Sequence, residues 1–187
     1  MDNKKQTSHI IKILQAAGLE ISTETIEGIP VTVARGIVLE EPVTTSDAMV
    51  AILTPFLKKK VKLYFYIPLG EVDDISVQTI DQFSDRARDF CKAANKVDKK
   101  QKKHKSKGSI CIPILLSGNA DSEAKGWVMK TTKAKWSIFT MPTIIDLNSN
   151  EIFFRSDTPF VGLFIYKIAK ELIDTVIRKA LAGIELN

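Results

Sequence analysis

Five carboxylate side chains follow two apolar segments of this sequence and are its best candidates for chemistry. The apolar segments are residues 61–67 and 110–116. When two such segments form parallel neighbouring strands, their carboxyl ends share one edge of the sheet, which is where open α/β sheets bind ligands. Mg²⁺ prefers oxygen ligands, so two or three of these acids could hold one magnesium ion, with Lys107 or Lys125 facing a phosphate. The acids are Glu71, Asp73, Asp74, Asp121 and Glu123, and the last four of these are also the candidates for catalysis.

A structural role accounts for the same acids. Asp73, Asp74 and Asp121 precede predicted helices, where the helix dipole favours negative charge and capping is common. Glu123 and Lys125 match half of a metal-dependent nuclease signature, in which both side chains point the same way from a strand. Here the pair falls in a predicted helix, where positions i and i+2 do not share a face. The sequence therefore leaves both a magnesium site and a set of helix-terminal acids open.

A further polar group flanks a predicted hairpin near the C-terminus. Asp146, Arg155 and Asp157 could line a pocket together with Trp136. An ion pair within the hairpin and an aspartate at the start of a helix explain the same residues.

Positive charge is concentrated in one short segment. The chain has 27 basic and 22 acidic residues, a net charge of +5, but six of its lysines lie between positions 99 and 107. Without these six the balance is 21 against 22, or −1. We expect residues 98–108 to form a mobile loop, which either contacts phosphates of a nucleic acid or is only a solvated charged segment. The six lysines are Lys99, Lys100, Lys102, Lys103, Lys105 and Lys107.

Several familiar kinds of site are excluded by composition. With only His9 and His104, the chain has no histidine-rich zinc site and no credible Ser-His-Asp triad. Cys91 and Cys111 lie in apolar patterns without a CxxC motif, which is typical of buried thiols. The glycine patterns of dinucleotide and P-loop sites do not occur. No cofactor is evident, apart from Mg²⁺ if the acids bind one.

The elements that must position the candidate acids form a strand–helix–strand unit. Residues 61–67 are rich in β-branched and aromatic side chains and predict a central strand. Ser76 is a good N-cap for a long helix whose apolar residues recur every three or four positions, up to Val97. Residues 110–116 predict a buried strand in which Pro113 indicates a bulge or an edge position. Such a unit forms a right-handed parallel crossover.

The remaining segments complete the predicted fold. Residues 19–39 alternate around Glu27-Gly28 and predict an antiparallel hairpin, and residues 143–155 predict a second one. Helices are expected before Gly18, after Ser46, at 121–129 and, at greater length, at 160–182, with a strand at 135–139. The predicted fold class is α/β with α+β features, a single domain over residues 1–187. One mixed sheet carries a central parallel βαβ unit, two antiparallel hairpins and a long C-terminal helix packed on it.

Two functional hypotheses from different classes follow. The first is a non-catalytic intracellular binding or assembly module with a basic loop, which associates with itself, with a protein partner or with nucleic acid. The alternative is a magnesium-dependent enzyme acting on phosphate-containing substrates, nucleic acid among them. No apolar run is long enough to span a membrane and no signal peptide is recognisable, so we expect a cytoplasmic protein.

Overall fold

The structure is a computed structural model that describes residues 3–16, 18–38, 63–101, 108–135, 138–155, 157 and 163–181. Its helices are α1 (Asn3–Ala16), α3 (Val77–Lys100), α4 (Ser122–Val128), α5 (Leu163–Leu172), the π-helical segment η1 (Ile173–Ile177) and α6 (Arg178–Leu181). Its strands are β1 (Glu20–Ile26), β2 (Ile29–Val38), β3 (Leu63–Glu71), β4 (Asp74–Ile75), β5 (Gly108–Cys111), β6 (Ile114–Ser117), β7 (Asn119–Ala120), β8 (Lys133–Lys135), β9 (Ile138–Thr140), β10 (Thr143–Asp146) and β11 (Glu151–Phe153).

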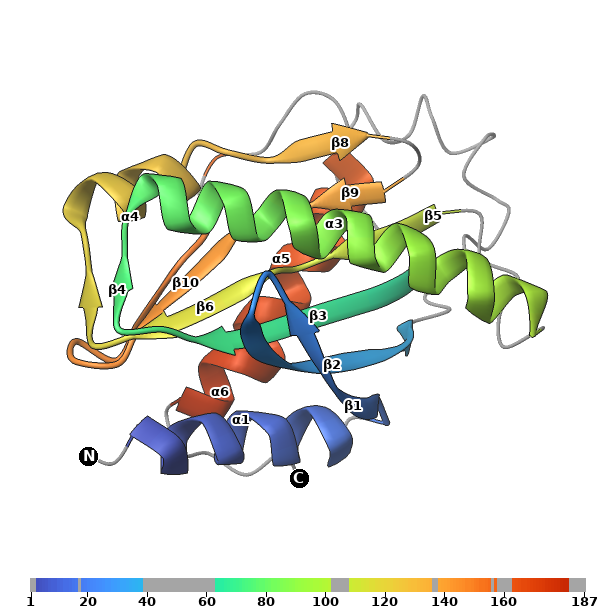
Figure 1. The fold of residues 1–187 in the computed structure, drawn as a ribbon, viewed down its shortest axis with the longest axis horizontal. Helices are drawn as coiled ribbons and strands as arrows, with labels where there is room; N and C mark the ends of the chain where they lie inside the picture. Colours follow the sequence, from blue (N-terminus) through green and yellow to red (C-terminus); the bar gives the residue numbers. More distant parts are fainter. Residues whose placement is uncertain are drawn as a thin grey trace, which may run out of the picture.

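One mixed sheet forms the centre of the fold (Figure 1). β3 pairs in parallel with both β5 and β6. On their other sides, β5 pairs in parallel with β9, and β6 pairs in parallel with β10. β2 joins the other side of β3 antiparallel, and β1 pairs antiparallel with β2. β8 and β11 add antiparallel strands beside β9 and β10. The predicted α/β class, the parallel crossover from β3 through α3 to β5 and both flanking hairpins are therefore confirmed.

Three prolines lie side by side across the parallel strands. Pro68, Pro113 and Pro142 each come one residue before the cross-strand partners Leu69, Ile114 and Thr143. Proline has no N–H to donate to a sheet ladder. Accordingly Pro113 falls between the consecutive strands β5 and β6, and Pro142 falls between β9 and β10. Hydrogen bonds from the neighbouring residues bridge the break, such as that from Thr143 N to Pro113 O at 3.0 Å. Pro113 therefore marks a break in the middle of the sheet. The alternative prediction, that Pro113 indicates an edge strand, is wrong.

Helices cover both faces of the sheet, α3 in front and α5 behind it in Figure 1. Two separate clusters of buried side chains correspond to the two faces. One contains Ile80, Phe83 and Ala87 of α3 together with side chains of α4. The other contains residues of α1, α5 and η1. A helix on each face explains why β3 is buried from Leu63 to Gly70.

The helix termini follow the expected local chemistry. Ser76 is the N-cap of α3, and its side chain accepts the Thr79 N–H at 3.2 Å, as predicted. The hairpin turn between β1 and β2 places Glu27 and Gly28 at positive φ, 54° and 77°. Such a two-residue turn needs positive φ at both positions, which Gly28 adopts without strain. None of the helices among the described residues is both long and apolar enough to cross a membrane.

Three details differ from the sequence prediction. Residues 135–139 were predicted as one strand, but Lys135 ends β8 and Ile138 begins β9, and these two strands pair antiparallel. The predicted loop 98–108 begins later, since α3 continues through Lys100, and residues 102–107 lie outside the described residues. The last helix is interrupted by η1. The helix predicted after Ser46 also lies outside the described residues.

Candidate functional site

The carboxyl ends of the two central strands meet at one edge, as the sequence predicts. Beyond this edge, β4 and β7 pair in parallel and place Asp74 opposite Asn119. The Asn119 side-chain amide donates a hydrogen bond to the Asp74 carboxylate. The Ser117 hydroxyl donates to the backbone oxygen of Asp73 at 2.6 Å and accepts the Asn119 N–H at 2.8 Å. These bonds join the loops that follow the two strands.

The five candidate acids are all exposed at this edge. Glu71 accepts a hydrogen bond from the Thr7 hydroxyl of α1 at 3.4 Å, and Asp74 is bonded to Asn119. Within the described part of the chain, no three histidine, cysteine or acidic side chains form a group that could hold a metal ion. Magnesium binding by these residues therefore stays a prediction. The five are Glu71, Asp73, Asp74, Asp121 and Glu123.

Glu123 and Lys125 lie in helix α4, as expected. Lys125 Nζ donates to Asp146 Oδ2 at 2.5 Å and lies 5.0 Å from the centre of the Phe153 ring. Asp146 is buried and also accepts the backbone N–H groups of Asn148, at 2.9 Å, and Ser149, at 3.2 Å. Burial alone would raise the pKa of Asp146, but the bonds from Lys125 and from these two N–H groups lower it. Lys125 is therefore held by a carboxylate instead of facing open solvent.

The second predicted polar group is only partly described. Arg155 and Asp157 form a two-bonded ion pair, with both N···O distances 3.0 Å, and Arg155 also donates to the Thr132 hydroxyl at 2.8 Å. Trp136 lies outside the described residues. An ion pair within the hairpin was predicted, but Arg155 pairs with Asp157, which follows the hairpin, and Asp146 pairs with Lys125. A pocket with Trp136 is not tested.

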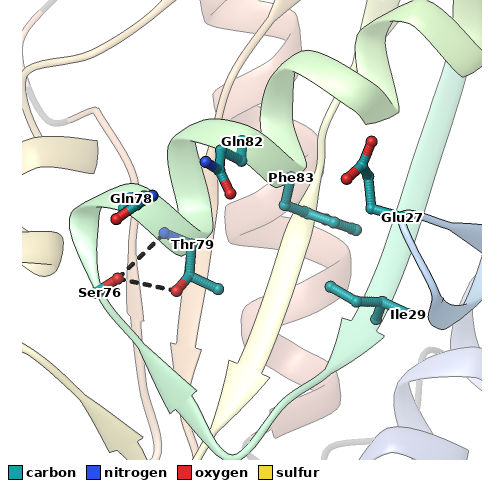
Figure 2. Close-up of a pocket in the computed structure, with 7 residues that line it drawn as sticks. All are labelled: Glu27, Ile29, Ser76, Gln78, Thr79, Gln82 and Phe83. Atoms are coloured by element: carbon teal, nitrogen blue, oxygen red, sulfur yellow. Dashed lines mark hydrogen bonds between the residues drawn. The ribbon is translucent and has the colours of Figure 1, made fainter.

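A small cavity of about 220 Å³ lies beside the N-terminal half of α3. Figure 2 shows its lining, with the Phe83 side chain pointing from the helix toward Ile29 of β2. Glu27 contributes its one charged side chain, and that carboxylate forms an ion pair with Arg86 at 2.7 Å. The other lining side chains are neutral, and of these Ile29 and Phe83 are apolar and the rest polar. The residues that line it are Glu27, Ile29, Ser76, Gln78, Thr79, Gln82 and Phe83.

A buried polar network lies under the opposite, C-terminal end of α3. The Tyr66 hydroxyl donates to Asp98 Oδ2 at 3.0 Å, and Arg35 Nη1 lies 3.8 Å from Asp98 Oδ1. Arg35 also donates to Glu20 at 3.0 Å. Asp98 is 1 % exposed and Tyr66 is fully buried. Glu20, Arg35 and Tyr66 are direct cross-strand neighbours on β1, β2 and β3, so the sheet itself presents them as one row to the helix.

This network determines the charge of the adjacent surface. The sequence pattern placed Val97 on the buried face of α3, but Val97 is 50 % exposed and Asp98 is buried in its place. The lysines of this part of α3, by contrast, are exposed. Two of them were not among the predicted phosphate contacts, although their spacing from Lys100 along the predicted helix could have identified them. The exposed lysines are Lys92, Lys96, Lys99 and Lys100.

Comparison with known proteins gives no relative. No protein-family model matches the chain, and no curated protein and no solved structure shows significant similarity to it. Its function is therefore inferred from its own geometry.

Proposed function

We propose that this protein is a non-catalytic binding module that holds the phosphate backbone of a nucleic acid at the C-terminal end of α3. One observation carries the proposal. Between positions 90 and 109 the sequence has eight lysines and a single acid, Asp98, and this acid is buried. The eight are Lys92, Lys96, Lys99, Lys100, Lys102, Lys103, Lys105 and Lys107.

The burial of Asp98 takes the one acid between positions 90 and 109 away from the solvent-facing side of the helix. Its carboxylate is directed to Tyr66 and Arg35, so the solvent-facing side of this helix end carries positive charge. Lys92, Lys96 and Lys100 recur at intervals of four residues, which places them along one face of a helix with a rise of about 6 Å between them. A row of this kind suits a chain of phosphates, because lysines that neutralise phosphates release bound counterions.

The packing of the apolar side of α3 favours a nucleic acid, not a membrane surface, as the partner of these lysines. A helix that binds at a membrane interface inserts its apolar face into the lipid. In α3 that face is already packed on the sheet through Ile80, Phe83 and Ala87. Within the described residues, Val97 and Met129 are the large apolar side chains that are exposed.

The test is the salt dependence of binding to a fluorescent DNA or RNA oligonucleotide, measured by anisotropy. The double variant Lys96→Gln/Lys100→Gln should bind about tenfold more weakly at low salt, and its log–log salt slope should be smaller by about one to two. The matched control is Lys12→Gln/Lys130→Gln, which removes the same charge from exposed lysines elsewhere. Equal weakening by both pairs, or no binding by the wild-type chain, would overturn the proposal.

We also propose that the protein associates with itself or with a protein partner, and that it is located in the cytoplasm. The apolar side of the last helix contributes Tyr166, Leu172 and Ile173 to the core of this chain. A dimer would therefore have to use other surfaces. Light scattering of the purified protein tests the dimer, and cell fractionation tests the location.

The magnesium-dependent enzyme is the second candidate, and the meeting of the two strand ends at one edge favours it. Calorimetric titration with Mg²⁺ tests it directly. Binding that is abolished by Asp74→Asn/Asp121→Asn but not by the lysine variants would support this candidate. Absence of any heat of binding, together with no turnover of phosphate esters, would remove it.

A further inference from the structure

The two cysteines of the sequence are in contact in the core. Cys91 of α3 and Cys111 of β5 have their Sγ atoms 3.2 Å apart, with Cys91 donating, and both residues are fully buried. They are free thiols. A disulfide joins its sulfur atoms at about 2.0 Å, so a movement of about 1 Å would bring this pair to bonding distance.

Their position in the fold gives such a bond a mechanical consequence. Cys91 lies in the second half of the crossover helix, and Cys111 is the direct cross-strand neighbour of Tyr66 on a central strand. A bond between them would fasten α3 to the sheet close to the network of Tyr66 and Asp98. The two cysteines are 20 residues apart, and the eight lysines between positions 90 and 109 all lie between them in the sequence.

We propose that Cys91 and Cys111 form a modification site at which a peroxide produces an intramolecular disulfide. The thiolate of one cysteine attacks a peroxide oxygen of hydrogen peroxide, which breaks the O–O bond and gives a sulfenic acid and hydroxide. The second thiolate attacks the sulfenic sulfur, forms the S–S bond and displaces hydroxide. Counting protons, two thiols and one hydrogen peroxide give one disulfide and two waters. A dithiol reductant reverses the bond by exchange.

Burial controls access to this site without preventing it. Hydrogen peroxide is small and uncharged, and local opening of a helix end exposes groups that are covered in the average structure. Once one sulfur is oxidised, its partner is already in contact. Formation of the disulfide within one chain should therefore exceed reaction between chains.

The experiment is intact-mass analysis of the full chain after treatment with hydrogen peroxide, followed by unfolding and alkylation. We expect a loss of about 2 Da, no alkylated cysteine, and recovery of two alkylated cysteines after dithiothreitol. A gain of about 16 or 32 Da without that loss, a cross-linked dimer, or two thiols that remain alkylatable would overturn the proposal. Cys91→Ala and Cys111→Ala should each lose the 2 Da change, but the result on the wild-type chain decides the question by itself.

Thermal unfolding supplies a second measurement. Closing a loop of this size should raise the unfolding midpoint of the oxidised chain over the reduced chain by about 5–10 °C. An unchanged or lower midpoint would show that the bond distorts the fold and would overturn the tethering of α3. Neither measurement uses a nucleic acid, so the disulfide can be established even if the proposed binding function fails.

Discussion

The hydroxyl of Tyr66 donates a hydrogen bond to the carboxylate of Asp98 over 3.0 Å, in the interior beneath the end of α3. Burial, followed by the hydrogen bond and the negative charge of Asp98, raises the pKa of Tyr66 far above its usual value. The tyrosine therefore remains a donor across the accessible pH range. This hydrogen bond holds Asp98, the one acid between positions 90 and 109, in the interior.

Replacing Tyr66 by Phe removes this donor while preserving the ring. We expect Tyr66→Phe to lower the free energy of unfolding by about 1–3 kcal/mol, because a buried carboxylate loses a partner. Urea denaturation measures the change. Asp98→Ala should cost at least as much, because it leaves the Tyr66 hydroxyl and Arg35 without this acceptor. Equal stability of Tyr66→Phe and the wild type would mean that the bond is not stabilising.

Two glycines give a matched pair of opposite predictions. A Cβ at Gly70 of β3 would lie 3.1 Å from Ile29 Cγ2 and 3.3 Å from Leu115 Cδ2, whereas a Cβ at Gly126 of α4 would meet nothing within 4 Å. Gly70→Ala should therefore destabilise the fold by about 1–3 kcal/mol through overpacking. Gly126→Ala should stabilise it by about 0.5–1 kcal/mol, since alanine is the better helix former. Thermal denaturation of both variants tests the pair, and the same sign for both would contradict it.

The main strands and helices could be predicted because their patterns are local. Ser76 precedes a helical period of apolar residues, and Glu27-Gly28 separates two alternating segments, so the cap and the hairpin followed from short-range rules. The alignment of the prolines was harder. Pro68, Pro113 and Pro142 lie in three similar short segments, each with Ile or Met before the proline, but only the register of the sheet brings them into one row.

The candidate site was less predictable, because it depends on contacts between distant segments. Asp98 lies among lysines in the sequence, and nothing nearby indicates that Arg35 and Tyr66 would hold it inside. The acids after β3 and β6 were predicted to share an edge, and they do. Whether they converge on one ion depends on side-chain directions, which a sequence pattern does not determine.

Because of the ion pair of Lys125 and Asp146, the free energy of unfolding should fall as the pH is lowered into the acid range. Although burial opposes it, the bonds from Lys125 and from backbone N–H groups lower the pKa of Asp146. A carboxyl whose pKa is lowered by folding stabilises the native state above its unfolded pKa of about 4, and this contribution is lost as the pH falls through the folded value. Asp146→Asn should therefore destabilise the protein by about 1–2 kcal/mol at pH 7 and by less at pH 3. Urea denaturation at both pH values measures this. The control is Glu123→Gln, at an exposed position in the first turn of α4, the helix of Lys125. Loss of this charge should cost no more than about 0.5 kcal/mol at pH 7, the size of an exposed charge–dipole interaction.

The rate at which peroxide closes the cysteine pair should rise steeply with pH. Burial, and then the contact with Cys111, raises the pKa of the Cys91 thiol well above its usual value. The thiolate is the form that attacks peroxide, so its fraction limits the reaction at neutral pH and grows about tenfold for each pH unit below the pKa. Quenching the reaction with acid at intervals and measuring the loss of about 2 Da gives the rate at each pH. Glutathione in the same buffers is the control, because its rate should begin to level off near pH 9, where an ordinary thiol titrates. A rate for the protein that levels off at or below this pH would contradict the raised pKa and would indicate that opening of α3, not ionisation, limits the reaction.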